Sequence, residues 1–456
     1  MEDLTPAALA QLKETLTAAL ARLGPERSAP AARFQAAAER FCAGRWRVLV
    51  AGLRSVGKSS FVGALWGDAE MLPTAVRDCT QTNTLIRPPA SGEPDRGICL
   101  SYLPRAQVVE YALRDATYYR LTQMLHDTAQ VLSAELEEQL PEARLRAVAA
   151  AVRRLFEERP KLLVLHEELT DDLEELEQLL AFLDSPAYQP GVRLPARWED
   201  RSAHLMGRRR SDGRTVEAGR LRALEHVEIT RSTPRWPADV PQLIDTPWVP
   251  AYHEARRAEL ILRQAQTTDV LVLLSLPERF EPEEWVVRLL AQRPEMARRV
   301  VVVFNQIDTV DAAALYARDG FAATFAANSV RLARLGILPE NLLMSCARLP
   351  FLQALAQDQA VRDRTARLRA VLGQLTRLAQ NHARDDFTRK FLAACDPDDA
   401  GLHSFEAHLK ELRRTAVWPA QTRAALAAWN EIPLLDIPEA NRRPWQDLRA
   451  AAKRTE

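Results

Sequence analysis

Residues 52–60 form a short, glycine-containing stretch whose residue types suit phosphate binding. They read Gly-Leu-Arg-Ser-Val-Gly-Lys-Ser-Ser, after an apolar run at 48–51 and before a helical pattern at 61–66. A strand, a loop and a helix in this order are what a phosphate-binding P-loop requires. Glycines let the backbone wrap around an anionic oxygen, and the following helix directs its positive dipole end there. The stretch predicts binding of a nucleoside triphosphate; the alternative is a strand–helix turn without a ligand.

Two side chains of this loop have the chemistry to act on the nucleotide. Lys58 would reach the β- and γ-phosphates, and the Ser59 hydroxyl would hold Mg²⁺. Lysine is rare in this chain, which uses arginine almost everywhere, so a compact point charge at position 58 fits a phosphate ligand. The other residues expected to contact the nucleotide here are Gly52, Arg54, Ser55, Val56, Gly57 and Ser60.

An acidic residue follows a later apolar strand pattern, as a nucleotide site needs. Asp245 ends the run at 242–245, and Thr246 and Pro247 form a tight turn after it. Such an aspartate holds Mg²⁺, usually through water, and the turn senses the γ-phosphate. A strand that ends in a surface aspartate is the alternative. The order of the motifs along the chain favours the metal-binding interpretation.

The next motif bears on which base is bound. Asn305, Gln306 and Asp308 follow the valine-rich run at 300–304. The asparagine can fix the nucleotide loop, and the Asp308 carboxylate can accept two adjacent N–H donors of a guanine edge, which adenine lacks. Further on, Ser345 and Cys346 end another strand pattern, where backbone N–H groups would meet the guanine O6. These motifs favour GTP over ATP, although a P-loop ATPase stays open as a third interpretation.

In this order, the motifs resemble those of the dynamin superfamily of GTPases, in particular bacterial dynamin-like proteins and relatives of mitofusin. The double serine of the P-loop is typical of that family, and residues 71–87, which contain Leu-Pro-Thr, resemble its switch I. The resemblance covers roughly 45–103 and 222–350. It implies that Thr80 ligates Mg²⁺ and orients the attacking water, with Thr82 as the fallback. The catalytic candidates are then Arg54, Ser55, Lys58 and Thr80, and the metal ligands Ser59, Thr80 and Asp245.

Three positions depart from the family pattern. Trp248 stands where the family has glycine, so the second switch would be stiffer or would present an aromatic surface to a partner. Gln306 replaces a lysine whose stem covers the base. Arg54 takes the place of a polar residue that orients water; a cation there would stabilise the transition state, or would be a solvated or interdomain arginine.

Strand and helix patterns alternate from Arg47 onward, which predicts an α/β fold with a mixed, mostly parallel sheet. Between about 104 and 222 the pattern is mostly amphipathic helix, with one leucine-rich stripe at 145–155 and another at 173–183. We therefore expect N-terminal neck helices at 1–44 and a GTPase domain at 45–355 with a long helical insertion. A C-terminal helical bundle at 356–456 would complete the neck. The predicted strands are 47–51, 83–87, 97–102, 226–230, 242–245, 270–276, 300–305 and 342–345.

Composition limits the other functions that the chain could have. Its 456 residues carry no formal net charge, so no general attraction to nucleic acid is indicated. The five cysteines are scattered without metal-ligand spacing, as expected for reduced thiols. No signal-peptide pattern opens the chain, and no apolar run reaches the roughly 18 residues that span a bilayer. We expect a cytoplasmic bacterial protein that contacts a membrane at most peripherally.

Two functions are compatible with these sequence features. The first is a dynamin-like GTPase that hydrolyses GTP with Mg²⁺ when its GTPase domains dimerise, and that transmits the change to a helical neck, in membrane remodelling with a partner. The second is a GTP-binding regulatory switch or scaffold with weak hydrolysis, whose helical insertion docks a partner protein. About a hundred residues follow the last nucleotide motif, too few for a neck and a full trunk. A minimal family member, a partner dynamin-like chain or a role for the insertion would each account for this.

Overall fold

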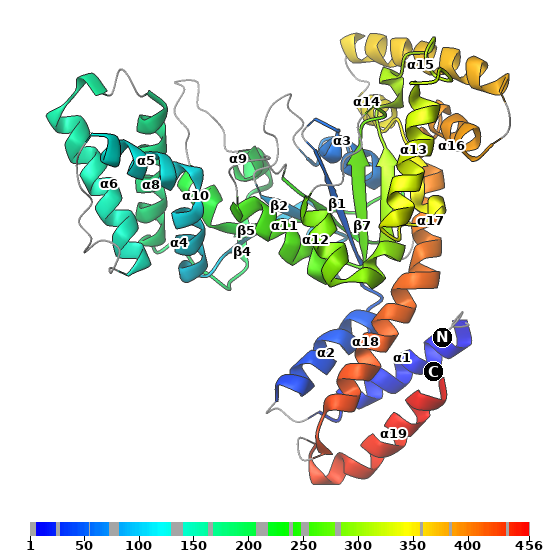
Figure 1. The fold of residues 1–456 in the computed structure, drawn as a ribbon. Helices are drawn as coiled ribbons and strands as arrows, with labels where there is room; N and C mark the ends of the chain where they lie inside the picture. Colours follow the sequence, from blue (N-terminus) through cyan, green and yellow to red (C-terminus); the bar gives the residue numbers. More distant parts are fainter. Residues whose placement is uncertain are drawn as a thin grey trace.

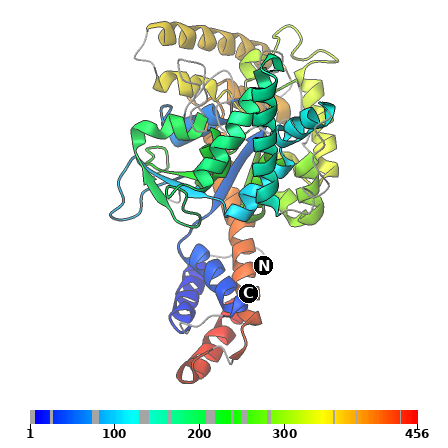
Figure 2. The same ribbon diagram turned by 90° about the vertical axis from the view of Figure 1, so that its left-hand side faces the viewer.

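The structure is a computed structural model that describes residues 6–23, 28–53, 55–72, 82–128, 140–162, 167–206, 218–236, 240–247, 255–278, 284–355, 359–382, 385–434 and 437–455. These residues form an α/β layer around a nine-stranded sheet, a helical bundle beside one edge of the sheet, and a second helical bundle below it (Figure 1). We call this second bundle the neck. Figure 2 shows it projecting from the α/β layer.

The strands of the sheet run in the order β4-β3-β5-β2-β6-β1-β7-β8-β9. Strand β1 pairs in parallel with both β6 and β7, and β8 and β9 continue the parallel half. On the other side, β2 is antiparallel to β6, and β3 is antiparallel to β4 and β5. The prediction of a mixed, mostly parallel sheet is confirmed. The strands are β1 (Arg47–Gly52), β2 (Asn83–Arg87), β3 (Gly97–Tyr102), β4 (Leu194–Ala196), β5 (Leu224–Thr230), β6 (Gln242–Asp245), β7 (Val270–Ser275), β8 (Val300–Phe304) and β9 (Leu342–Met344).

Burial explains the sequence patterns of these strands. Every residue of β7 and β8 is buried, as expected for parallel strands covered by helices on both faces, and both strands are continuous apolar runs. Strand β3 lies near the edge and alternates between buried and half-buried positions. The eight predicted strands all form, within two residues at each end.

The structure adds one strand that the sequence pattern did not indicate. Strand β4 has only three residues, Leu-Pro-Ala, and pairs with β3 at the outer edge of the sheet. Proline cannot donate a hydrogen bond to a neighbouring strand, so it is tolerated only at such an edge. A segment this short gives no alternation that could be recognised among helical patterns.

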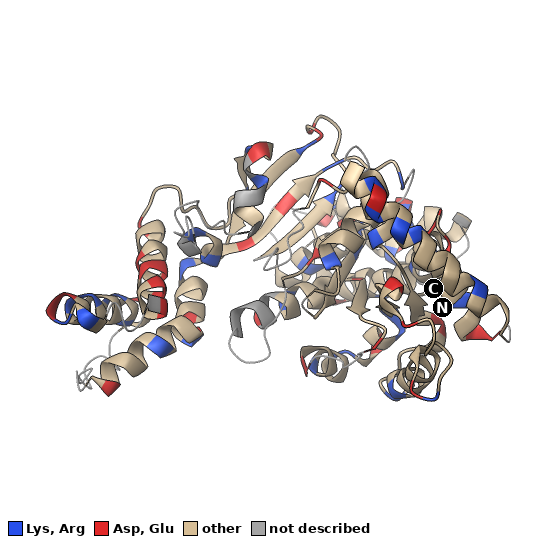
Figure 3. Cartoon of the chain, turned by 90° about the horizontal axis from the view of Figure 1, so that it is seen from above, with Lys and Arg blue, Asp and Glu red and all other residues tan. Residues whose placement is uncertain are grey.

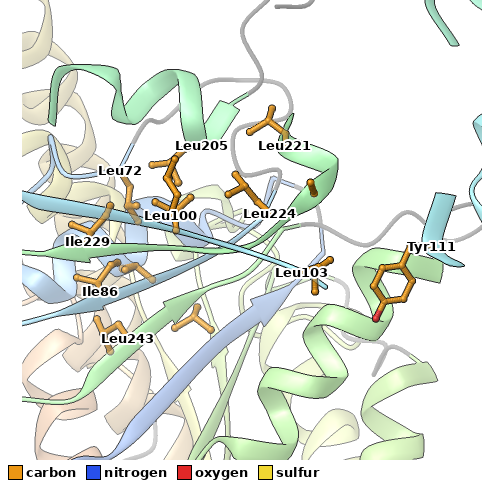
Figure 4. Packing of buried hydrophobic residues seen from close by; sticks show 14 of the residues in the cluster. Leu72, Ile86, Leu100, Leu103, Tyr111, Leu205, Leu221, Leu224, Ile229 and Leu243 are labelled. Atoms are coloured by element: carbon orange, nitrogen blue, oxygen red, sulfur yellow. The ribbon is translucent and has the colours of Figure 1, made fainter. Parts of the chain in front are cut away.

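Helices cover both faces of the sheet. Along β1, Val48 and Val50 contribute to one apolar cluster while Leu49 and Ala51 contribute to the other, because successive side chains point to opposite faces. Figure 4 shows the first cluster near the antiparallel side, with side chains from neighbouring strands facing Leu72 and Leu205. The covering helices are α3 (Lys58–Trp66), α9 (Arg201–Met206), α11 (Ala255–Thr267), α12 (Glu284–Gln292), α13 (Phe321–Arg334) and α14 (Arg348–Ala354).

The predicted insertion is mostly helical, as expected, and it packs as a bundle. Its two predicted apolar stripes, at 145–155 and 173–183, are buried in the first cluster. Ion pairs in which at least one partner is buried or half-buried join its helices, among them Arg120 with Asp172 at 2.6 Å and Arg222 with Glu175 at 2.5 Å. The helices are α4 (Arg105–Arg114), α5 (Ala116–Asp127), α6 (Pro141–Glu158), α8 (Glu167–Leu183) and α10 (Ala218–Ala223).

The neck joins helices from both ends of the chain, as predicted. Its core is aromatic: the ring of Phe34 lies 5.3 Å from that of Trp429 and 5.7 Å from that of Trp445, between centroids. Figure 3, a view from above, marks the two termini close together and shows charges of both signs interspersed along the ribbon. The neck helices are α1 (Pro6–Leu20), α2 (Ala29–Cys42), α18 (Trp418–Glu431) and α19 (Arg442–Thr455).

The expected bundle at 356–456 is not a single unit in the structure. Helices α15 (Gln359–Gln380) and α16 (Asp386–Cys395) bury Leu372 and Phe391 in the second sheet cluster, and α17 (Leu402–Leu412) buries Phe405 in the first. Only the part from α18 onward packs with the N-terminal helices. Amphipathic periodicity marks the buried face of a helix but does not say which surface covers it.

Helix α17 continues into α18 through a π-helical stretch at Arg413–Val417. The helical run from Leu402 to Glu431 thereby connects the α/β layer to the neck (Figure 1). A guanidinium N–H of Arg413 donates to the carbonyl oxygen of Gly44, at 3.0 Å, where the chain enters β1 from the neck.

Candidate functional site

The P-loop joins the carboxyl end of β1 to the first turn of α3. Gly57 precedes α3 with a left-handed φ of 84°, and a Cβ on it would lie 2.9 Å from the side-chain nitrogen of Asn305. At Gly52, φ is 151° and a Cβ would lie 2.3 Å from the carbonyl oxygen of Leu274. Side chains are excluded at both positions, by backbone conformation and by close approach of neighbouring segments. Both glycines of the sequence motif therefore have a structural cause.

Lys58 is the first residue of α3 and points back into the loop. Its ammonium group donates to the carbonyl oxygens of Gly52 at 2.9 Å and Leu53 at 3.0 Å, and the residue is only 9% exposed. A nearly buried cation therefore lies at the positive end of a helix dipole, inside a turn of backbone. This combination favours an anionic ligand, as the motif predicted.

Ser59 and Asp245 meet beside the loop. The Ser59 hydroxyl donates to a carboxylate oxygen of Asp245 at 2.8 Å. The contact follows from topology, because β1 and β6 are adjacent parallel strands in which Val50 pairs with Asp245. Thr246 continues the turn, and its hydroxyl donates to the carbonyl oxygen of Val50 at 2.9 Å.

The Ser59 and Asp245 pair fits a magnesium ion in chemical type. Mg²⁺ takes oxygen ligands and is commonly held by one or two protein groups together with waters and phosphates. A hydroxyl and a carboxylate oxygen within hydrogen-bond distance of each other, next to the phosphate loop, are such a pair. In the described part of the chain, no three His, Cys, Asp or Glu residues gather into a metal-binding cluster.

Asn305 and Gln306 hold the P-loop from the opposite side. The Asn305 side chain donates to the carbonyl oxygen of Val56 at 2.9 Å and accepts from the N–H of Ala347 at 3.2 Å, and the residue is 2% exposed. Gln306 has a left-handed φ of 62°, and its side chain donates to the carbonyl oxygen of Ser55 at 2.8 Å. These bonds join three segments that are distant in sequence. Gln306, which the motif would place over the base, is here a contact of the phosphate loop.

Asp308, the residue expected to read guanine, has its carboxylate covered. The Cys346 thiol donates to one oxygen at 3.3 Å, the guanidinium of Arg348 lies 3.5 Å from the other, and the side chain is 5% exposed. Burial raises the pKa of the Cys346 thiol, and the neighbouring negative charge of Asp308 raises it further. Two donors thus already converge on the carboxylate. The Arg348 side chain itself is largely exposed.

The backbone donors expected around Ser345 and Cys346 are engaged within the protein. The N–H of Ser345 donates to Phe304, that of Cys346 to the carbonyl oxygen of Ala400 at 3.1 Å, and that of Ala347 to Asn305. The Ser345 hydroxyl also donates to the carbonyl oxygen of Ala400, at 3.0 Å. In this arrangement none of these three N–H groups is directed to a guanine O6. The corner between α16 and α17 supplies the acceptor for Cys346, and a role of this loop toward guanine stays a prediction.

Several predicted site residues lie outside the described residues: Arg54, Thr80 and Trp248. Thr82, the fallback for Thr80, is fully buried before β2, and its hydroxyl donates to the carbonyl oxygen of Glu225 at 3.4 Å. Ser60 lies half-buried in the first turn of α3. The structure therefore brings Lys58, Ser59, Asp245 and Asn305 together at the P-loop, and it places Asp308 beside Cys346. It adds Arg348 and Ala400, whose involvement no motif indicated.

Among the described residues, no helix combines the length and the apolar character needed to cross a membrane. No protein-family model matches the chain, and no curated protein matches it.

Among the solved structures that are similar to the chain, two are described as an oligomerised bacterial dynamin pair that provides a mechanism for long-range sensing and tethering of membranes. One is 12% identical with a TM-score of 0.39, and the match covers 92% of this chain and 52% of that one. The other is 12% identical with a TM-score of 0.37, and the match covers 98% of this chain and 65% of that one. The chain therefore spans about half to two thirds of the length of the bacterial dynamin chains that it resembles.

Proposed function

We propose that this protein is a dynamin-like GTPase that binds and hydrolyses GTP with Mg²⁺. The observation that carries the proposal is the meeting of Ser59 and Asp245, at 2.8 Å, beside a P-loop whose Lys58 is turned inward. A phosphate-binding turn and a pair of oxygen ligands at the same strand ends are what a nucleotide with its metal needs. The order of the remaining motifs, and their resemblance to the dynamin superfamily, support GTP as the nucleotide.

Each residue has a defined part in this proposal. Lys58 would exchange its two backbone acceptors for phosphate oxygens, and Ser59 and Asp245 would hold the metal ion. Mg²⁺ bound there would neutralise charge on the β- and γ-phosphates. Asn305 keeps the loop in its binding shape, and Asp308 would accept the N–H donors of guanine. We assign the positioning of the attacking water to Thr80, with Arg54 and Ser55 as further catalytic candidates.

The proposal is tested by nucleotide binding and turnover. Purified protein should bind GTP more tightly than ATP in competition and should release phosphate from GTP only when Mg²⁺ is present. Lys58→Ala should abolish binding, and Asp245→Asn should raise the Mg²⁺ concentration that turnover requires. Lys410→Ala is the matched control, because this lysine lies on α17 over the ring of Trp236. Equal binding of ATP, or turnover that survives Lys58→Ala, would contradict the proposal.

A second function, a GTP-binding switch or scaffold with weak hydrolysis, is favoured by the insertion. Its helices form a bundle beside the sheet, away from the P-loop, and so present a separate surface for a partner (Figure 1). Turnover measured against protein concentration separates the two functions. Assembly-driven hydrolysis, as in dynamins, rises more steeply than linearly with concentration, whereas a monomeric switch gives a straight line. Peripheral contact with a membrane and pairing with a related chain belong to the first proposal.

A further inference from the structure

A cavity of about 370 Å³ lies between the neck and the α/β layer, far from the P-loop. Its walls come from α2 and α18 of the neck, from the segment that leads from α11 into β7, and from the 3₁₀-helix Pro294–Arg299. The carboxylate of Asp269, in this wall, accepts from the N–H of Arg47, the first residue of β1. The P-loop begins at the other end of that strand, about 17 Å away at 3.3 Å per residue.

The cavity is lined with an excess of positive charge. Four arginines face two carboxylates, Asp269 and Glu295. The arginines come from both bodies: Arg40 and Arg423 from the neck, and Arg293 and Arg299 from the α/β layer. Guanidinium groups remain charged in proteins, and their planar forks match the oxygens of phosphate groups.

Arg293 donates to Glu295 at 2.9 Å and to the carbonyl oxygen of Gln266 at 2.6 Å, but the two carboxylates do not satisfy all four guanidinium groups. Arg40 pairs with Asp269 at 2.5 Å, yet its Nε is buried without a hydrogen-bond partner. Arg299 is 6% exposed, and its guanidinium donates to the backbone oxygen of Asp269 at 3.3 Å. Within the described residues, no hydrogen bond or ion pair engages the guanidinium of Arg423. Thr268 also lines the cavity; it is 3% exposed and its hydroxyl has no partner.

Electrostatics at the wall agree with this geometry. Burial lowers the pKa of Arg299, and repulsion from the neighbouring Arg293 lowers it further. Burial and the charge of Arg40 likewise lower the pKa of Arg47. Desolvated cations close to one another repel, and because they stay protonated, an anion placed among them would relieve that repulsion.

We propose that this cavity binds a small phosphorylated molecule, and that the bound anion holds the neck against the α/β layer. Its volume is at the lower end of small-molecule sites, which suits one or two phosphate groups rather than a large cofactor. Arg423 reaches the anion from the neck, and Arg293 and Arg299 reach it from the other wall. The Thr268 hydroxyl supplies a neutral donor. The site needs no nucleotide in the P-loop, so it stands apart from the proposed GTPase activity.

Inorganic pyrophosphate is the test ligand, titrated calorimetrically into the Lys58→Ala protein so that the P-loop does not compete. The Lys58→Ala protein should bind pyrophosphate. Adding Arg423→Ala to it should weaken that binding at least about tenfold, since hydrogen bonds to charged groups contribute most. Thr268→Val should weaken binding by about threefold to tenfold without loss of stability, because it replaces an unpartnered hydroxyl with a methyl of similar size. Arg33→Ala is the matched control, because Arg33 lies on α2 but pairs with Glu431 at the surface, at 2.8 Å.

Three outcomes would overturn the proposal. One is the absence of pyrophosphate binding by the folded Lys58→Ala protein, with folding checked by circular dichroism. Another is unchanged affinity in both Arg423→Ala and Thr268→Val. The third uses vesicles of phosphatidic acid and phosphatidylcholine. If the protein sediments with these vesicles in a way that depends on Arg423, and does not bind free pyrophosphate, the ligand is a lipid phosphate and not a small molecule.

Discussion

Replacing Asn305 by alanine should damage nucleotide binding far more than its effect on stability alone would suggest. The side chain donates to the Val56 carbonyl at 2.9 Å and accepts from the Ala347 N–H at 3.2 Å. Both partners are buried, so the substitution leaves one acceptor and one donor without a bond. Each costs about 1–3 kcal/mol, which gives about 2–6 kcal/mol for the pair.

Most of that energy favours one loop shape, because the Asn305 bonds connect the P-loop to the segment after β9. If the loop loses about 2–3 kcal/mol of its preference for the binding shape, the apparent affinity for nucleotide falls about 30- to 150-fold. The measurement is a fluorescence titration with a labelled guanine nucleotide, beside urea unfolding of the same samples. Asn305→Asp should lie between the parent and the alanine variant, since a carboxylate can still accept from Ala347 but cannot donate to Val56.

The chain provides a matched control in Asn341. This residue is also fully buried and also makes two side-chain bonds, donating to the carbonyl oxygen of Arg298 at 3.2 Å and lying 2.9 Å from the ring nitrogen of His408. Asn341→Ala should cost a similar unfolding free energy and leave nucleotide affinity unchanged. The reasoning is refuted if Asn305→Ala binds nucleotide within about threefold of the parent, or if both alanine variants weaken binding equally.

Four further predictions concern single side chains. Asp308→Asn should weaken GTP binding and shift the preference toward xanthine nucleotides, measured by competition; unchanged selectivity would remove Asp308 from base recognition. Thr80→Ala should spare nucleotide binding and slow phosphate release at least about tenfold, because its role is confined to the metal and the attacking water; unchanged turnover would move that role elsewhere. Burial raises the pKa of Cys395 to about 12, so iodoacetamide at pH 8 should leave it unmodified while the half-buried cysteines react, as read by mass spectrometry. Burial lowers the pKa of His408 below its ordinary 6.5. The contribution of neutral His408 to stability is therefore complete above pH 6.5, and it is lost below that pH by up to about 1.4 kcal/mol per pH unit. In urea unfolding, His408→Gln should flatten this dependence of stability on pH.

The sheet was predictable because its strands carry strong local signals. Strands β7 and β8 are uninterrupted apolar runs, and β3 alternates, which distinguishes buried parallel strands from an edge region. Strand β4 was not predicted from the sequence pattern, because its three residues form a strand only through pairing with β3. Local pattern determines whether a segment is extended, whereas pairing partners depend on the whole fold.

The candidate site was predictable to the extent that its residues belong to motifs. Lys58 and Ser59 meet Asp245 because adjacent parallel strands place their carboxyl ends together. Arg348, which covers Asp308, and Ala400, which engages the loop after β9, belong to no motif. Ala400 lies 55 residues from Ser345 in the chain, and only tertiary packing brings the two together.

The corner at Ala400 also gives a physical path between the loop after β9 and the neck. Ala400 has a left-handed φ of 52°, and Gly401 has a φ of 79°. A Cβ added to Gly401 would lie only 2.4 Å from the carbonyl oxygen of Met344, so no side chain fits there. The corner is therefore fitted tightly against the end of β9, and its carbonyl oxygen holds both the N–H of Cys346 and the hydroxyl of Ser345.

Helix α17 starts directly after this corner and runs through the π-helical stretch into α18, a length of about 45 Å for 30 residues. A displacement of the loop after β9 would therefore move one end of a long helical run. The other end of that run lies in the neck core, where its Trp429 packs against Phe34. The π-helical stretch is the one place along this run where the regular α-helical hydrogen bonding changes, and there Arg413 bonds to Gly44 at the entry to β1. A bend between the two bodies would concentrate at that point. The path has the mechanical continuity that the proposed coupling of nucleotide state to neck position requires.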